Sequence, residues 1–165
     1  MRTILLGEAP KHPGGYAFDW TSWTTEQIAG VVGVSPYHLN KVFWVMNIFE
    51  QRQATSKGGY DQFSVRDAVD EIHEKWFESQ RIICVGIRVS TAMEIALDIT
   101  AGSIPENRFA RCNGTARGNG WELARIPHPS GLRGNEDRDG LVLPMETRRF
   151  LVRAADGKAQ RQQRA

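Results

Sequence analysis

Two loops in this 165-residue chain carry side chains that together could perform acid/base chemistry. The first is Gly7-Glu8-Ala9-Pro10, with a carboxylate, and the second is His128-Pro129-Ser130-Gly131-Leu132, with an imidazole. Each loop follows an apolar run of strand-like residues. Open α/β sheets hold their ligand sites in loops at the carboxyl ends of strands. The two side chains are therefore predicted to share one site.

Each of these side chains has a chemical and a plainer interpretation. Glu8 could orient a water molecule or stabilise a developing cation, and His128 could donate a hydrogen bond to a leaving group that gains negative charge. Ser130 with the Gly131 backbone is similar to a phosphate-binding turn, because small residues let amide groups approach an anion. Taken singly, a loop glutamate and a loop histidine are more often solvated or structural.

Four apolar runs predict strands, and they alternate with helical patterns. The predicted strands are residues 3–6, 42–47, 81–86 and 122–126. Strands that alternate with helices are typical of βαβ units and a parallel sheet. We therefore expect an α/β fold, a three-layer α/β/α sandwich around a mostly parallel four-stranded sheet.

Capping residues and apolar spacing predict the helices. Thr24 and Gln27 have the spacing of a capping box, and a short helix is expected near Ser35-Pro36. Ser64 is expected to cap a helix that runs to about Ser79. Its predicted buried stripe is Val65, Val69, Ile72, Trp76 and Phe77. Residues 87–97 and 142–155 predict two further helices, whereas residues 100–121 are rich in turn formers and predict a long loop.

Length, charge and cysteine content limit the class of protein. Residues 1–157 are expected to form one domain with its own core, followed by a basic, flexible tail at residues 158–165. Residues 108–165 hold 12 Lys and Arg against 6 Asp and Glu, whereas the preceding residues are net negative. This asymmetry favours a polyanionic partner.

Membrane association, disulfides and metal binding are not expected. No apolar run reaches the roughly 20 residues of a membrane span, and the first residues lack a signal-peptide pattern. Cys84 and Cys112 form no CxxC pair, and Cys84 lies in an apolar run that predicts a buried thiol. We expect a cytoplasmic monomer.

In combination the two loop motifs become more specific. GEAP after the first strand and HPSGL after the last resemble motifs of the uracil-DNA glycosylase superfamily. Residues 31–35, 43–49 and 81–86 are similar, in the same order, to a helix, an asparagine-ending strand and a glycine-ending strand of that fold. The resemblance covers residues 2–155. The two loop motifs at its ends are specific to the superfamily, whereas the three runs between them are found in many folds.

The resemblance implies an enzyme that flips one nucleotide out of DNA and hydrolyses its N-glycosidic bond. Glu8 would orient the water and offset positive charge on the sugar, and His128 would stabilise the departing base. Asn47 would read the base edge, and Phe18, or less favourably Tyr16, would stack on the base. The implied DNA contacts are Pro10, Lys11, Ser130, Gly131, Leu132 and Arg133, the last two filling the gap left in the duplex. A loop with Arg111, Asn113, Arg117 and Asn119 could cover a bulky base.

Departures from the family pattern refine this expectation. Branches with GEAP-like motifs usually hold an iron–sulfur cluster on four cysteines, and two cysteines exclude that cluster, so no cofactor is expected. Ala9 stands where other branches have Asp or Asn, which leaves the water chemistry to Glu8. Neither motif contains a lysine for a Schiff base, so the enzyme would be monofunctional. Trp20 and Trp23 could line the pocket or pack in the core.

The sequence is compatible with three functions. The first is a monofunctional DNA glycosylase acting on duplex or single-stranded DNA. Its base would be uracil, a mismatched thymine or a bulky phage-type modified cytosine, in DNA repair or anti-phage defence. The second, suggested by Ala9, is a non-catalytic reader of modified DNA on the same fold. The third is a hydrolase of free nucleosides or nucleotides.

Overall fold

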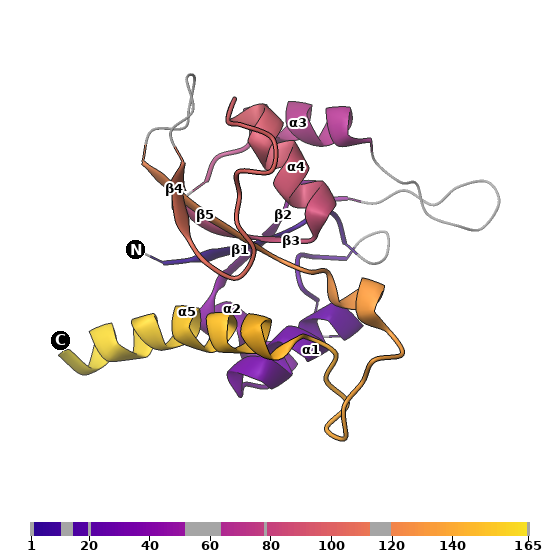
Figure 1. The fold of residues 1–165 in the computed structure, drawn as a ribbon, viewed down its shortest axis with the longest axis vertical. Helices are drawn as coiled ribbons and strands as arrows, with labels where there is room; N and C mark the ends of the chain where they lie inside the picture. The colour runs from indigo at the N-terminus through magenta and orange to yellow at the C-terminus, as the bar shows by residue number, and fades with distance from the viewer. Residues whose placement is uncertain are drawn as a thin grey trace.

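A five-stranded, mostly parallel sheet forms the centre of the fold (Figure 1). The computed structural model describes residues 2–10, 15–19, 21–51, 64–77, 79–112 and 120–164, with side chains up to residue 155. The strands are β1 (Ile4–Gly7), β2 (Trp44–Asn47), β3 (Arg81–Val85), β4 (Ala110–Cys112) and β5 (Trp121–Ile126). Their order across the sheet is β2-β1-β3-β5-β4.

The predicted α/β class and mostly parallel sheet are confirmed, but the predicted number of strands is wrong. β1 pairs in parallel with β2 and β3, and β3 pairs in parallel with β5. The additional strand is β4. It lies in the stretch predicted as a loop and pairs with β5 in the antiparallel direction. The three residues of β4 are too few to show the alternation of apolar and polar side chains that predicts a strand. The segment is a strand because it pairs with the edge of β5.

Helices lie against both faces of the sheet (Figure 1). Helices α3 (Val65–Glu74) and α4 (Ile87–Ala96) lie on one side, and α1 (Trp23–Val32), α2 (Leu39–Val42) and α5 (Met145–Arg164) lie on the other. Successive strand residues point to opposite faces. Leu6, Ile82 and Cys84 therefore join the core under α3 and α4, whereas Leu5 and Ile83 join the core under α1 and α5.

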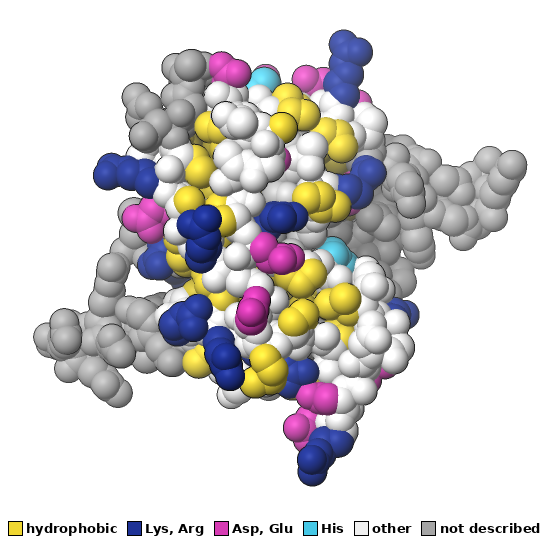
Figure 2. Space-filling model, in the orientation of Figure 1, with side chains coloured by type: hydrophobic (Ala, Val, Ile, Leu, Met, Phe, Trp, Pro, Cys, Tyr) yellow, Lys and Arg dark blue, Asp and Glu magenta, His cyan; other side chains and the backbone are white. Residues whose placement is uncertain are grey.

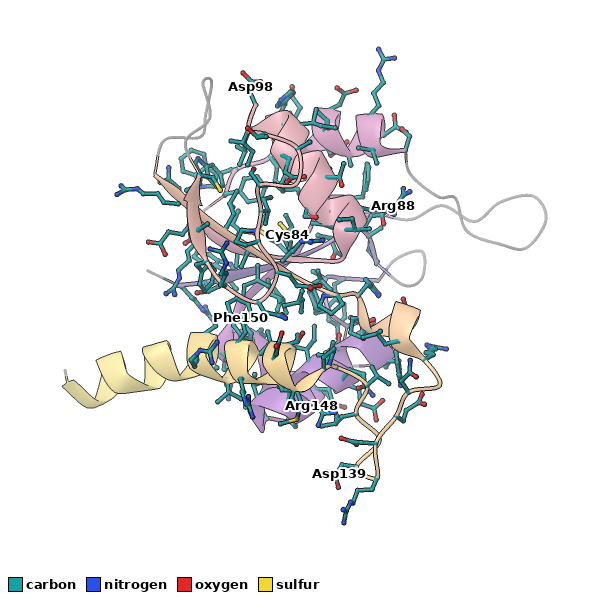
Figure 3. All side chains as sticks on the ribbon, in the orientation of Figure 1. Cys84, Arg88, Asp98, Asp139, Arg148 and Phe150 are labelled. Atoms are coloured by element: carbon teal, nitrogen blue, oxygen red, sulfur yellow. The ribbon has the colours of Figure 1, made fainter. Side chains whose placement is uncertain are left out.

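Figure 3 shows this arrangement in side chains, with Cys84 inside the sheet region and Phe150 reaching toward the sheet from α5. The prediction that Cys84 is a buried thiol is confirmed. Cys84 and Cys112 are both free and buried, and burial raises the pKa of each thiol. Neither thiol is thus poised as a nucleophile.

The helix predictions are confirmed in part. The cap of α3 is present, because the Asp67 N–H donates to Ser64 Oγ at 3.0 Å. However, α3 ends at Glu74, where Lys75 turns extended as the chain heads for β3. Trp76 therefore lies beyond the helix and is 81% exposed, so its predicted place in the buried stripe is wrong. Val69 and Ile72 of the stripe are buried as expected.

Near Ser35-Pro36 the structure has the predicted short helix, a 3-10 turn at Pro36–His38 that continues into α2. Helix α4 (Ile87–Ala96) matches the helix predicted at residues 87–97 to within one residue. The last helix, α5, starts at Met145 rather than at residue 142, and its backbone continues to Arg164, beyond the predicted end at residue 155. The predicted flexibility of residues 158–165 stays a prediction.

The predicted capping box of α1 is wrong. The helix begins at Trp23, with Ser22 as a cap residue that makes no side-chain cap bond. Gln27 is 3% exposed and serves a long-range contact instead. Its Nε2 donates to the Gly140 carbonyl at 2.8 Å, and its Oε1 accepts from the Val142 N–H at 2.9 Å. Gln27 therefore joins α1 to the segment that leads into α5.

Among the described residues, no helix is both long and apolar enough to pass through a lipid bilayer.

Replacing Gln27 with Ala tests this junction. The substitution leaves the buried Val142 N–H without its partner, and an unpaired buried donor costs about 1–3 kcal/mol. We expect the free energy of unfolding, measured by urea denaturation, to fall by about that amount. Q51A, at an exposed position, is the control and should change it by less than about 0.5 kcal/mol. Equal stability of Q27A and wild type would contradict the assigned role.

Candidate functional site

A pocket of about 550 Å³ opens at the carboxyl ends of the parallel strands. The chain leaves β1, forms β2 on one side of it, and returns to form β3 on the other side. The connections after β1 and β3 therefore diverge. This reversal is the topological switch point at which open α/β sheets bind ligands.

Most of the predicted site residues lie around this pocket. Those that line it are Glu8, Pro10, Tyr16, Phe18, Asn47, His128, Ser130, Gly131 and Arg133. The two motifs, 120 positions apart in the sequence, thus meet at one cavity. Trp23, for which both a pocket and a core position were open, also lines it.

Other predicted residues do not line the pocket or lie outside the described part of the chain. Leu132 is half-buried and packs against the core under α1 and α5, whereas the neighbouring Arg133 is exposed. Arg111 lies on β4 opposite Glu122, near the amino end of β5, so the structure does not bring it to the pocket. Lys11, Trp20, Asn113, Arg117 and Asn119 lie outside the described residues.

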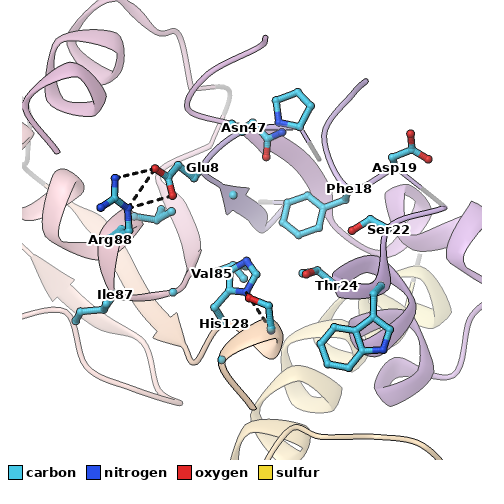
Figure 4. A pocket seen from close by; sticks show the side chains of 18 of the residues that line it. Glu8, Phe18, Asp19, Ser22, Thr24, Asn47, Val85, Ile87, Arg88 and His128 are labelled. Atoms are coloured by element: carbon cyan, nitrogen blue, oxygen red, sulfur yellow. Dashed lines mark hydrogen bonds and ion pairs between the residues drawn. The ribbon is translucent and has the colours of Figure 1, made fainter. Parts of the chain in front are cut away.

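Gly7 lets the Asn47 and Phe18 side chains approach the end of β1. Gly7 is directly opposite Asn47 in the parallel register of β1 and β2. A Cβ on Gly7 would lie 2.5 Å from Asn47 Oδ1 and 3.3 Å from the Phe18 ring. Asn47 is 8% exposed, and its carboxamide lines the pocket beside Phe18 (Figure 4). The missing side chain thus creates the space that these two groups fill.

Phe18 reaches the pocket through an uncommon backbone conformation. Its φ is 50°, in the left-handed region that bulky residues rarely adopt. Such conformations cost free energy and are concentrated at binding sites, where the surroundings enforce them. The ring, half-buried against the core, forms one wall of the cavity.

A second glycine brings His128 to the end of β3. The Gly86 N–H donates to the Ile126 carbonyl at 2.9 Å, which joins the ends of β3 and β5. Gly86 has a φ of 95°, and a Cβ there would lie 3.2 Å from His128 Cβ. His128 therefore lies next to the β3 loop although it follows β5.

The hydrogen bonds of His128 set its tautomer. The Ser130 backbone N–H donates to His128 Nδ1 at 3.2 Å, and Ser130 Oγ lies 2.6 Å from the same nitrogen. Since a backbone N–H can only donate, Nδ1 accepts, and the neutral ring carries its proton on Nε2. The ring faces the space between Glu8 and Phe18 (Figure 4). His128 thus presents a hydrogen-bond donor to the pocket.

The protein environment favours the neutral form of His128. Partial removal of the ring from water lowers its pKa below the ordinary 6.5, while the nearby negative charge of Glu8 acts in the opposite direction. Glu8 and His128 both line the same pocket.

Glu8 is paired with Arg88, a residue that the sequence prediction missed. Arg88 Nε lies 3.2 Å from Oε1 and 3.3 Å from Oε2, and Nη2 lies 3.1 Å from Oε1. Figure 4 shows the carboxylate turned toward Arg88, on the side of the pocket away from Phe18. The available signal was the position of Arg88, two residues after the glycine that ends the third predicted strand.

The wall opposite Glu8 is formed by the start of α1, which was also missed as a site element. The Ser22 and Thr24 side chains line it, together with Trp23 and Asp19 (Figure 4). Ser22 makes no side-chain cap bond, and it belongs to the pocket lining. The guanidinium of Arg133 lies 4.5 Å from the centre of the Trp23 ring, in a cation–π contact at the rim.

Within the described part of the chain, no three His, Cys, Asp or Glu side chains gather closely enough to hold a metal ion.

Neither models of known protein families nor curated protein sequences match this chain. The resemblance to the uracil-DNA glycosylase superfamily therefore rests on the two loop motifs and stays a prediction.

Replacing Gly7 with Ala tests the packing at the end of β1. The new methyl group requires Asn47 Oδ1 to move, because 2.5 Å is shorter than any normal contact. We expect the Asn47 side-chain NH₂ cross peaks in a ¹H–¹⁵N spectrum to shift, while most backbone cross peaks stay in place. G30A, whose Cβ meets only the end of the Leu141 side chain, is the control and should leave the Asn47 signals unchanged. An unmoved Asn47 in G7A would contradict this arrangement.

The state of His128 is tested by a pH titration of its ring nitrogens with long-range ¹H–¹⁵N correlation. We expect the Nε2–H tautomer at neutral pH and a pKa below 6.5. Because the unfolded chain then binds more protons, this group contributes stability that is present above about pH 6.5 and is lost as the pH falls through the folded-state pKa. A ring protonated on Nδ1, or a raised pKa, would contradict the geometry.

Proposed function

We propose that this protein is a monofunctional DNA glycosylase that hydrolyses the N-glycosidic bond of an altered pyrimidine. The observation that carries the proposal is the meeting of Glu8 and His128 at one pocket, with Asn47 and Phe18 on its walls. A carboxylate, an imidazole donor, an amide and an aromatic ring match the needs of this reaction. Its transition state has positive charge on the sugar and negative charge on the base.

His128 would stabilise the base as it leaves. When the bond between C1′ and the base nitrogen breaks, the base keeps the electron pair and becomes an anion. The Nε2–H of the neutral imidazole can donate to the base oxygen that gains this charge. A donor held in place before the reaction stabilises charge that develops only in the transition state.

Glu8 would act on the sugar side. Its negative charge can offset the positive charge that develops at C1′, and a carboxylate oxygen can orient a water molecule toward this carbon. The water oxygen forms the new bond to C1′, and its proton is transferred to the carboxylate and on to solvent. The product is an abasic site.

Asn47 and Phe18 would select and hold the base. A carboxamide offers both a donor and an acceptor to the base edge, and an aromatic ring stacks on a flipped base. A cavity of about 550 Å³ lies within the usual range for small-ligand sites and leaves room for a base that carries a substituent. The hydroxyls of Ser22 and Thr24 could receive such a substituent.

Contacts with DNA would come from the pocket rim. Ser130, Gly131 and Arg133 lie there, and the stacked Arg133 guanidinium is well placed to fill the space of a flipped nucleotide. On the face shown in Figure 2, the described Lys and Arg side chains are interspersed with Asp and Glu. Binding is thus proposed at the rim, on a three-layer α/β/α arrangement, rather than on that face.

The proposal is tested with oligonucleotides that carry uracil, mismatched thymine or 5-substituted cytosines, as duplexes and single strands, scored for alkali-labile abasic sites. We expect base release by the wild-type protein from at least one of them. E8Q and H128A should slow single-turnover release by about 10²–10³-fold while DNA affinity changes little. E26Q, which removes an exposed carboxylate on α1, is the matched control and should be as active as wild type.

Other results would point elsewhere. Salt-dependent DNA binding without any base release would favour the non-catalytic reader. Faster hydrolysis of a free nucleoside than of DNA would favour the nucleoside hydrolase. Base release that is equal in wild type, E8Q and H128A would overturn the assigned chemistry.

A further inference from the structure

We propose that Arg88 is a positioning residue that holds Glu8 in the orientation needed for base release. This inference rests on the proposed function and adds to it a residue that belongs to neither loop motif. Arg88 acts through the Glu8 carboxylate and not by contact with DNA.

The contact geometry is that of a fixed carboxylate. Oε1 accepts from both Nε and Nη2 of Arg88, whereas Oε2 accepts from Nε alone. An ionised carboxylate has about four acceptor positions. Oε2 thus keeps more of its capacity than Oε1, and it is the oxygen left to bind the attacking water.

The two residues follow different strands, which only the sheet brings together. Glu8 follows β1 and Arg88 lies in the first turn of α4, after β3. The Glu8 backbone is itself held, because its carbonyl accepts from the Phe49 N–H at 2.8 Å. With the main chain fixed on one side and the carboxylate fixed on the other, few rotamers remain for Glu8.

Helix stability does not explain an arginine at this position. The amino end of a helix carries a partial positive charge, and a cation in the first turn is unfavourable. The Arg88 and Glu8 side chains are 46% and 26% exposed, and partly exposed ion pairs contribute little to the stability of the fold. The cation is instead matched to the anion at the pocket rim.

The Arg88 charge also matters for His128. Glu8 raises the pKa of the His128 ring, and other charged groups on the pocket lining are Asp19 and Arg133. The Arg88 guanidinium beside Glu8 partly offsets the negative charge of the carboxylate. Arg88 thus weakens the electrostatic effect of Glu8 on the His128 ring.

The experiment compares R88Q, R88K, E8Q and the double variant on the oligonucleotide that the wild-type protein cleaves fastest. We expect R88Q to slow single-turnover release about 10- to 100-fold, because a misplaced catalytic group costs up to that factor. DNA affinity should change less than threefold. R88K restores part of the rate, since lysine supplies the charge without the two-nitrogen fork. R66Q, an exposed arginine on α3 outside the pocket, should match wild type.

Coupling separates positioning from other roles. If Arg88 acts through Glu8, the double variant E8Q/R88Q is no slower than E8Q. If Arg88 instead contacts DNA, R88Q weakens DNA binding and slows release in the E8Q background too, which overturns the proposal. A melting temperature within about 3 °C of wild type is expected for R88Q, and a large fall in melting temperature would indicate a structural role.

Failure of this inference can be told apart from failure of the proposed function. If wild type and R88Q release the base at the same rate, only the proposed role of Arg88 is contradicted. Absence of base release from every oligonucleotide by the wild-type protein removes the glycosylase function, and the positioning role with it. The pair itself is checked without DNA, because the Arg88 Nε–H resonance should shift in E8Q.

Discussion

The parallel hydrogen-bonded pairing of β2, β1, β3 and β5 is the constraint on which the site depends. Parallel neighbours end at the same edge of a sheet, so the four strand ends that place Asn47, Glu8, Arg88 and His128 lie side by side. The reversal of direction between β1 and β3 then opens the crevice. Without this pairing, residues separated by up to 120 positions in the sequence would not be brought together at one pocket.

Close approach of backbone and side chains at two strand ends gives the pocket its detailed shape. Gly7 admits the Asn47 carboxamide and the Phe18 ring, and Gly86 admits the His128 side chain. The left-handed backbone conformation of Phe18 is a further sign of close packing, because a bulky residue adopts it only when its surroundings require it. The pocket walls are closely packed around Asn47 and Phe18, and they are polar at Glu8, Ser22 and Thr24.

The charged groups at the pocket have defined partners. Glu8 faces Arg88, and Arg133 lies over the face of Trp23 rather than beside an acid. Partial desolvation lowers the pKa of His128 and so favours the neutral ring, whose Nδ1 accepts from the Ser130 N–H and leaves Nε2–H for a ligand. An anionic leaving group would thus meet a neutral donor, while the developing cation would meet a carboxylate. In the proposed function, this separation of roles would serve the breaking of a glycosidic bond.

The sequence by itself determined the features that depend on neighbouring residues. Four apolar runs became parallel strands, Ser64 capped its helix, and the two loop motifs marked the acid and the imidazole. Tertiary structure decided the rest. It made β4 a strand through the edge of β5, turned Gln27 from a cap into a long-range bridge, left Trp76 exposed, and brought Arg88 to Glu8. The partners of β4, Gln27 and Arg88 lie 9 to 115 positions away in the chain. Local propensity carries no information about such partners, because only the folded sheet makes them neighbours.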